Sequence, residues 1–261
     1  MKLPLYWVDA FTDKIFAGNP AAVVPLVEWL PDALMQQIAF ENGLAETAFF
    51  VKTAEGRYHL RWFTPVMEVD LCGHATLASA FIVFTQLGLT GETVTFDSRS
   101  GPLTVKRQPG GLLELDFPSR PAQPCATPDG LVQALGATPI QVAKARDIFC
   151  VFACEEDVLA LRPDFAGLAR LDAYAVIVTA PGCDRDFVSR FFALRAGINE
   201  DPVTGSAHCT LTPYWSDRLG KAKLHARQIS ARGGELWCEL RGDRVGIAGR
   251  AVLYLRGEIE A

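Results

Sequence analysis

Hydrophobic residues along the chain fall into many short runs that have the composition of strands. Aromatic and β-branched side chains dominate these runs, and Gly, Asp or Pro bound them. The runs are Leu5–Asp9, Thr47–Val51, Tyr58–Phe63, Val94–Phe96, Leu103–Arg107 and Leu112–Phe117. The pattern predicts a protein in which strands outnumber helices.

Three longer segments have the pattern of helices. Pro31–Phe40 spaces apolar residues four apart and is followed by Asn42 and Gly43, which is typical of a helix with one apolar face and a marked end. His74–Leu87 and Ser206–Leu219 each stop at a Gly. The first of these two is almost wholly apolar or small, so we expect the strands of its own half to enclose it.

A polar, turn-prone stretch leads through a Gly into each of the last two helices. The stretches are Asp70-Leu-Cys-Gly-His74 and Asp201-Pro-Val-Thr-Gly-Ser206, and we call them the first joint and the second joint. Their glycines, Gly73 and Gly205, lie 132 residues apart in a chain of 261, which predicts two similar halves. Each joint is expected to be a helix N-terminus, where free N–H groups can hold an anion. A small anionic substrate fits such a site.

The Pro-rich segment Pro118–Pro124 is the expected boundary between the halves. We therefore assign residues 1–117, with Glu46 and His74, to an N-terminal half. Residues 118–261, with Asp201 and Ser206, form a C-terminal half, although the last strand could cross back to the first half.

Composition narrows the class of protein. Hydrophobic residues make up 49% of the chain and charged residues 21%, which is ample for folded cores, and the net charge of −5 argues against binding to nucleic acid or anionic membranes. The sequence has neither a signal-peptide pattern nor a membrane-spanning run, and its seven cysteines are an odd number for a disulfide framework. We expect a cytoplasmic protein. The four histidines lack zinc-site spacing, so no metal is expected.

Four polar residues near the joints could carry chemistry. Glu46 lies between a helix end and an apolar strand, where a buried carboxylate can take and return protons. His74 falls in the first turn of the apolar helix, whose N-terminus is expected to lower the pKa of the ring. Asp201 and Ser206 flank the second joint, where each also suits a turn or a helix cap. Their convergence at element ends favours a functional site.

Four motifs in this order resemble the phenazine biosynthesis PhzF-like proteins. They are Val8-Asp-Ala-Phe-Thr12 with Gly18-Asn-Pro-Ala-Ala-Val23, then Ala45-Glu-Thr-Ala-Phe49, Asp70-Leu-Cys-Gly-His-Ala-Thr76, and Glu200-Asp-Pro-Val-Thr-Gly-Ser-Ala-His208. The resemblance spans nearly the whole chain. It implies an α+β fold of two pseudo-symmetric halves, each a β-barrel-like antiparallel or mixed sheet around a central helix, as in diaminopimelate epimerase. It also implies an active site between the halves.

The resemblance also implies residue roles. Glu46 is the acid–base residue, and His74, Asp201 and Ser206 complete the catalytic set. The expected substrate-binding residues are Asn19, Gly73, Ala75, Thr204 and Gly205. The phenazine enzyme isomerises trans-2,3-dihydro-3-hydroxyanthranilate without a cofactor, by moving a hydrogen between ring carbons. This chain is therefore expected to be a cofactor-independent, homodimeric isomerase of a small carboxylate-bearing substrate, such as a cyclic amino acid-like molecule.

Two other functions remain open at this point. A cofactor-independent amino-acid racemase or epimerase of this fold uses two cysteines, and Cys72 stands in the place of the first. The second joint has no Cys at the matching position, and Cys209 lies about a turn into the helix. A non-catalytic small-molecule binding protein would keep the anion site, but would gain nothing from a buried carboxylate such as Glu46.

Overall fold

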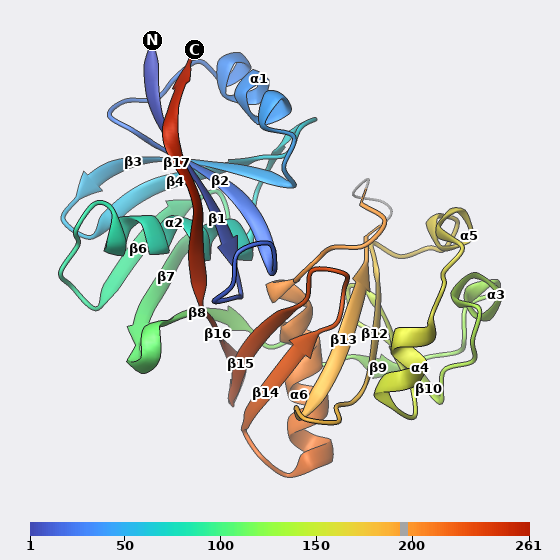
Figure 1. The fold of residues 1–261 in the computed structure, drawn as a ribbon. Helices are drawn as coiled ribbons and strands as arrows, with labels where there is room; N and C mark the ends of the chain where they lie inside the picture. Colours follow the sequence, from blue (N-terminus) through green and yellow to red (C-terminus); the bar gives the residue numbers. More distant parts are fainter. Residues whose placement is uncertain (194–197) are drawn as a thin grey trace. The chain divides into compact units, whose positions relative to one another are not determined.

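The computed structural model describes residues 1–193 and 198–261 (Figure 1). The chain divides into two compact units. The first comprises Met1–Asp116 and Ala248–Ala261, and the second comprises Phe117–Ile247. The first unit thus ends one residue before the boundary expected from the sequence, and the last strand, whose half the sequence left open, lies in the first unit.

The first unit is a mixed sheet with two α-helices. Its strands are β1 (Lys2–Ala10), β2 (Asn19–Leu26), β3 (Glu46–Ala54), β4 (Arg57–Phe63), β5 (Glu68–Val69), β6 (Thr93–Ser98), β7 (Gly101–Gln108), β8 (Leu112–Pro118) and β17 (Ala251–Glu260). Its helices are α1 (Asp32–Asn42), α2 (Gly73–Thr85) and the 3₁₀ turn η1 (Pro109–Gly111). The strand-like runs Leu103–Arg107 and Leu112–Phe117 fall in β7 and β8, which lie on either side of η1 and pair antiparallel.

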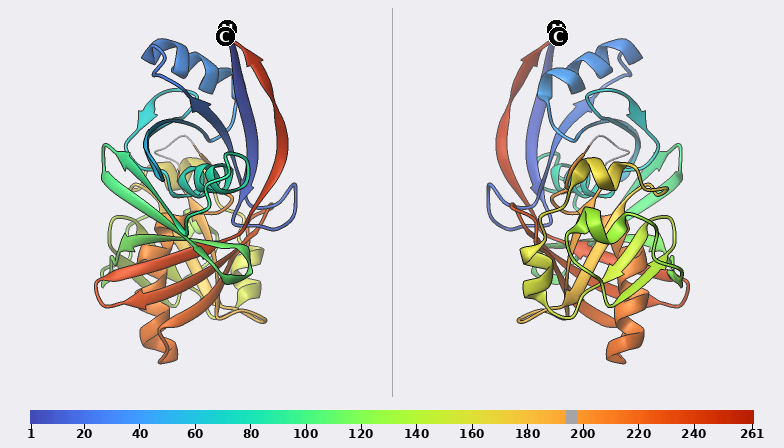
Figure 2. Two further views of the ribbon diagram at one scale, coloured as in Figure 1. Left: turned by 90° about the vertical axis from the view of Figure 1, so that its left-hand side faces the viewer. Right: turned by 90° about the vertical axis from the view of Figure 1, so that its right-hand side faces the viewer.

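Helix α2 is the central helix of the first unit. Ten of its thirteen residues are buried, and it packs against β1, β2, β3, β6 and β17 (Figure 2). The two hydroxyls in its buried part bond back to the helix: Thr76 Oγ1 donates to the Cys72 carbonyl at 2.5 Å and Ser79 Oγ to the Ala75 carbonyl at 2.7 Å. The helix can therefore be enclosed by apolar strands without leaving either hydroxyl unpaired. The enclosure is what the sequence predicted.

Helix α1 covers another face of the same unit. Met35, Ile38 and Ala39 are buried in a cluster with residues of β1, β2, β3 and β4. The helix ends at Gly43, whose backbone takes φ +63° and whose N–H donates to the Ala39 carbonyl at 3.3 Å. This left-handed turn brings the chain directly into β3, of which Glu46 is the first residue.

The second unit has a sheet of its own. Its strands are β9 (Gln123–Pro124), β10 (Gln141–Lys144), β11 (Ile148–Val151), β12 (Val176–Pro181), β13 (Phe187–Phe192), β14 (Lys223–Gln228), β15 (Gly234–Arg241) and β16 (Arg244–Gly249). Its helices are α3 (Leu131–Leu135), α4 (Glu155–Ala160), α5 (Phe165–Ala169), the 3₁₀ turn η3 (Gly205–Ala207) and α6 (His208–Leu219). The sequence pattern did not predict α3, α4 and α5, which are only five or six residues long.

The order of strand pairing repeats between the units. In the first, β2, β3, β4, β6 and β7 pair in turn as parallel, antiparallel, parallel and antiparallel neighbours. In the second, β11, β12, β13, β14 and β15 follow the same sequence of pairings. Helix α2 lies in the chain between β4 and β6, and α6 lies between β13 and β14. Each half is therefore built on one strand plan, with its main helix inserted at the same step.

Helix α6 is held on one side by an aromatic stack. The Trp215 and Phe187 rings are nearly parallel with centroids 5.6 Å apart, and the Trp215 Nε1–H donates to Thr179 Oγ1 at 3.0 Å. The predicted helix over 206–219 begins as η3 and becomes α-helical only at His208. No helix within residues 1–193 and 198–261 is long and apolar enough to cross a bilayer.

Candidate functional site

Glu46 and His74 lie against each other in the first unit. Glu46 is the first residue of β3 and His74 is the second residue of α2, and their side chains are only 14% and 7% exposed. Glu46 Oε2 and His74 Nε2 are 3.2 Å apart. The contact is not aligned as a hydrogen bond, and neither atom has another hydrogen-bond partner among the described residues. A buried carboxylate and a buried imidazole nitrogen are therefore both available for proton transfer.

The other ring nitrogen of His74 faces two side chains. Asn19 Nδ2 lies 3.3 Å and Cys72 Sγ lies 3.5 Å from His74 Nδ1. When the Asn19 amide donates to Nδ1, that nitrogen supplies its lone pair, so a neutral ring carries its proton on Nε2, facing Glu46. Asn19 is fully buried. The structure thus places Asn19 behind His74, and its expected contact with substrate stays a prediction.

The charge state of His74 is set by its neighbours. Burial disfavours the charged ring, but Cys72 and Glu46 outweigh burial and raise the pKa of His74 well above its usual range. The sequence prediction of a lowered pKa considered only the helix N-terminus and is wrong in sign. Burial, followed by the nearby Glu46, raises the pKa of the Cys72 thiol.

The raised pKa of His74 leads to a testable titration. We expect NMR to give His74 a pKa above its ordinary value of 6.5 in the wild type, and a lower pKa in the Glu46→Gln variant, because the variant loses a negative neighbour. The folded state then binds the proton more tightly than the unfolded chain. The charged ring therefore stabilises the fold fully below pH 6.5, and this contribution is lost as the pH rises through the raised pKa.

The resonance is assigned by its disappearance in a His74→Gln variant, since the chain has only four histidines. An unchanged His74 pKa in Glu46→Gln would contradict the contact between the two side chains.

The N-terminus of α2 offers backbone donors beside this pair. The helix begins at Gly73, directly after Cys72, and the first N–H groups of a helix have no carbonyl partner within it. The Ala75 N–H is directed at the Cys72 thiol. Gly73 is half-buried, whereas Ala75 is fully buried. Of the two predicted binding positions in the first turn of α2, Gly73 is thus the one with partial access to solvent.

The second joint is a closed hydrogen-bonded turn. The Thr204 hydroxyl donates to the Asp201 carboxylate in a very short contact. Gln228, from the end of β14, accepts the Thr204 N–H at 2.8 Å and donates to the Asp201 carbonyl at 2.7 Å. Gln228 is fully buried. Asp201 and Thr204 are therefore held together, and Gln228 fixes them from a strand that no local pattern connects to the joint.

The residues after Thr204 differ in burial and in hydrogen bonding. Gly205 is buried and Ser206 is half-buried within η3. His208 Nδ1 lies 3.0 Å from the Thr204 carbonyl, and burial lowers the pKa of His208 to about 4. His208 is thus a neutral ring that supports the turn. Each unit therefore has its own polar cluster, with Glu46 and His74 in the first unit and Asp201 and Thr204 in the second.

Glu46, Cys72 and His74 of the first unit lie close enough together to be considered as metal ligands. Ligand atoms of Glu46, Cys72 and His74 all lie within 4.8 Å of one another. However, Cys72 faces Nδ1 of the ring and Glu46 faces Nε2. An ion bound to one ring nitrogen could be reached by the residue that faces that nitrogen, but not by the residue that faces the other one. The set therefore supplies fewer than the three protein ligands typical of catalytic zinc. The donors fit proton transfer better than metal binding.

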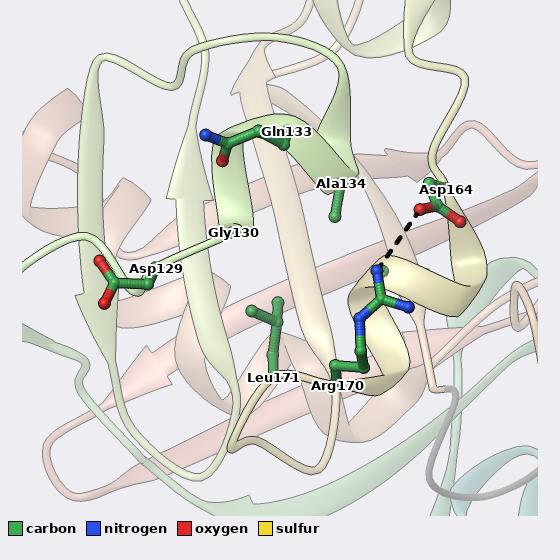
Figure 3. A pocket seen from close by; sticks show the side chains of 8 residues that line it. Asp129, Gly130, Gln133, Ala134, Asp164, Arg170 and Leu171 are labelled. Atoms are coloured by element: carbon green, nitrogen blue, oxygen red, sulfur yellow. Dashed lines mark ion pairs between the residues drawn. The ribbon is translucent and has the colours of Figure 1, made fainter.

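Two cavities lie within single units. One of about 180 Å³ lies beside α3 and α5 (Figure 3) and is lined by Asp129, Gly130, Gln133, Ala134, Asp164, Gly167, Arg170 and Leu171. Arg170 reaches toward Asp164 across it at 3.9 Å. The other, of about 440 Å³, is lined by Asp13, Phe81, Phe84, Thr85, Arg107, Gly110, Gly111, Leu113, Arg250, Ala251 and Val252. Neither is lined by a predicted site residue.

Comparison with known proteins gives consistent results over the whole chain. A model of the family described as phenazine biosynthesis-like protein matches residues 8–257. A Pseudomonas aeruginosa protein named as an uncharacterized isomerase is 52% identical over 99% of both chains. A crystal structure of a PhzF-family phenazine biosynthesis protein from Enterococcus faecalis is 48% identical, covers all of both chains and has a TM-score of 0.98.

A more distant structure bears on the fold alone. A hydroxyproline epimerase from Agrobacterium vitis has a TM-score of 0.63 at 11% identity, over 99% of this chain and 92% of the epimerase. These structures confirm the predicted α+β fold, which is shared with epimerases.

Proposed function

The chain belongs to the phenazine biosynthesis-like protein family, and on that premise we propose that it is a cofactor-independent isomerase with Glu46 as its acid–base residue. The observation that carries the proposal is the 3.2 Å contact between Glu46 Oε2 and His74 Nε2 in a buried setting. The name of the Pseudomonas relative supports an isomerase in general. The identity of the acid–base residue and of the substrate goes beyond that name.

In the proposed reaction, Glu46 removes a proton from a carbon that is made acidic by conjugation. The same carboxyl group returns the proton to another carbon of the substrate, so that the product has the same atoms as the substrate and no oxidant or reductant is required. A charged His74 beside Glu46 would stabilise the carboxylate between these steps. Asn19 would keep the ring turned toward Glu46 through its contact with Nδ1, with its amide oxygen facing the ring when Nδ1 carries a proton.

The substrate class follows from the donors near the two joints. The first N–H groups of α2 favour an anionic group, so we propose a small substrate that bears a carboxylate. We further propose that Asp201 and Ser206 bind amino or hydroxyl groups of a substrate. Thr204 and Gly205 belong to the turn that sets the position of Asp201.

The two cysteine thiols give the racemase alternative less support than Glu46 and His74 give the isomerase. A two-base racemase needs a thiolate on each side of the reacting carbon, but burial raises the pKa of Cys72 and raises that of Cys209 to about 11. Cys209 is also 98% buried, in the first turn of α6. A purely binding protein would have no use for a carboxylate placed against an imidazole.

The proposed function is tested by incubating the purified protein with trans-2,3-dihydro-3-hydroxyanthranilate and following the substrate by NMR. Conversion to an isomer of equal mass, at a similar rate in the Cys72→Ser variant, would support an isomerase that does not depend on the thiol. Loss of conversion in Cys72→Ser would favour the racemase-type mechanism. Saturable binding without conversion would favour the binding protein.

A further inference from the structure

The larger of the two cavities lies within the first unit, at a distance from Glu46 and His74. It has a volume of about 440 Å³, in the usual range for a small-molecule site, and is bordered by the last turns of α2, the turn η1 and the start of β17. Phe84, which lines the cavity, is the twelfth residue of α2, whereas His74 is the second. Ten residues of helix rise by about 15 Å, so the cavity is separate from the proposed active site.

Apolar side chains make up much of the lining. Phe84 and Leu113 are only 7% and 4% exposed, and Phe81 and Val252 are half-buried. Phe81 and Phe84 are three residues apart in α2, so their rings lie on the same side of the helix. Aromatic rings bind flat apolar groups by stacking or by edge-to-face contact. This part of the lining therefore suits an aromatic ring better than a free inorganic ion.

Arg107 adds a positive charge to this apolar lining. Its guanidinium lies over the Phe84 ring, 4.4 Å from the centroid, and its Nη2 donates to the Leu89 carbonyl at 3.3 Å. Arg107 and Leu113 are opposite each other in the β7–β8 ladder, so they share the face of the sheet that lines the cavity. Among the described residues, Arg107 forms no ion pair with a carboxylate. A guanidinium has five N–H groups, so donors remain for an anionic ligand.

Arg250 holds the rim of the cavity together. Its Nη1 donates to the Asp13 carboxylate at 2.8 Å, and its Nε donates to the Gly110 carbonyl at 3.3 Å. Arg250 thereby joins the loop after β1 to the turn η1, directly before β17 begins. The rim is thus fixed by contacts of the protein itself, as is usual for small-molecule sites. Asp13 offsets the charge of Arg250, which leaves the charge of Arg107 for a ligand.

We propose that this cavity binds a small aromatic carboxylate, with its ring against Phe81 and Phe84 and its carboxylate on the Arg107 guanidinium. A guanidinium can bind a carboxylate through two parallel N–H···O bonds, and stacking on Phe84 holds the guanidinium in place. The proposal does not depend on the proposed isomerase function, because none of its residues belongs to the Glu46 or Asp201 cluster.

Binding is tested with 2-naphthoate as the probe, by NMR titration of the isotope-labelled full chain. The amide signals of Gly110 and Gly111, which line the cavity, are expected to shift saturably. Two further compounds separate the ring from the charge. 2-Naphthamide has the same shape without the charge, and acetate has the carboxylate without the ring. Each lacks one of the two proposed contacts and is expected to bind about tenfold or more weakly than 2-naphthoate.

An Arg107→Gln variant tests the guanidinium. Loss of the charged hydrogen bonds should weaken binding of 2-naphthoate about tenfold or more and should leave binding of 2-naphthamide unchanged. A general distortion of the cavity would weaken both. The matched control is Lys106→Gln, which removes the same charge one residue earlier, on the opposite face of β7 and across from Glu114. It should bind 2-naphthoate within a factor of about two of the wild type.

A Thr85→Trp variant tests the cavity while both arginines stay in place. Thr85 is an exposed residue at the end of α2 that lines the cavity. The larger indole should fill part of the space and weaken binding of both 2-naphthoate and 2-naphthamide. Leu87→Trp is the control, since Leu87 is also exposed but does not line the cavity.

Three results would overturn the proposal. The first is equal affinity for 2-naphthoate in the wild type and Arg107→Gln, or equal affinity of the wild type for 2-naphthoate and 2-naphthamide. The second is acetate binding as tight as that of 2-naphthoate. The third is a set of saturable shifts that spares Gly110 and Gly111 and centres on Gly73, which would place the ligand at the proposed active site instead.

Discussion

Replacing Glu46 with Gln is expected to lower the turnover number of the enzyme about 10²- to 10⁴-fold, the usual range for the loss of a general acid–base group. The amide keeps the size and much of the shape of the carboxyl group, so the protein should fold normally. It cannot accept a proton from carbon at neutral pH. The measurement is the initial rate of isomerisation for the wild type and the variant at saturating substrate.

The matched control is Glu41→Gln, which removes an exposed carboxylate from α1, five residues earlier in the chain. This change should leave the rate within a factor of about two, since exposed charges away from the site have little effect on stability or structure. A Glu46→Gln variant that turns over as fast as Glu41→Gln would exclude Glu46 as the acid–base residue.

The second large effect is expected at Gly18, the residue before Asn19. Its backbone has φ +66°, and a Cβ at this position would lie 2.2 Å from the Ala10 carbonyl oxygen and 2.6 Å from a carbon of Thr12. The backbone must therefore move. We expect Gly18→Ala to cost about 2–5 kcal/mol in the free energy of unfolding, from the left-handed conformation together with the clash. Urea unfolding measures this cost.

Gly43→Ala separates the two contributions. Gly43 has nearly the same φ, +63°, but a Cβ there meets nothing within 4 Å. This variant should lose only the conformational cost of about 1–2 kcal/mol. Equal losses in the two variants would show that the close approach at Gly18 does not matter. Because Gly18 precedes Asn19, the larger loss would also disturb the support behind His74.

The sequence predicted the two joints, since their signals are local. A Gly that follows a turn-prone stretch and precedes a run of small and apolar residues marks a helix N-terminus without reference to the rest of the fold. The offset between Gly73 and Gly205 then predicted two similar halves. The strands of the two units pair in the same order of parallel and antiparallel neighbours, which agrees with that prediction.

Contacts between distant segments could not be predicted in the same way. Asn19 contacts His74 across 55 residues, and Gln228 contacts Thr204 across 24 residues, through strands that meet the joints only in the folded chain. The prediction of a lowered pKa at His74 was wrong for the same reason. The helix N-terminus was visible in the sequence, whereas the close approach of Glu46 and Cys72 to the ring was not.

The short helices of the second unit show a different limit. Helices α3 and α5 have five residues each, too few for a helical repeat of apolar positions to appear. They are stabilised by burial of residues such as Leu131, Leu135 and Leu168 in one apolar cluster. Tertiary packing, rather than local propensity, therefore decides their conformation.

The central claim is that Glu46 moves a proton between two carbons of the substrate. It is tested most directly by NMR in D₂O, with the wild type and the Glu46→Gln variant incubated in parallel with trans-2,3-dihydro-3-hydroxyanthranilate. We predict that the wild type gives an isomer with deuterium at the ring carbon that receives the proton, because the Glu46 carboxyl group exchanges its proton with solvent between the two steps. The variant should form this product about 10²- to 10⁴-fold more slowly. Deuterated product formed equally fast by both proteins would contradict the assignment of Glu46.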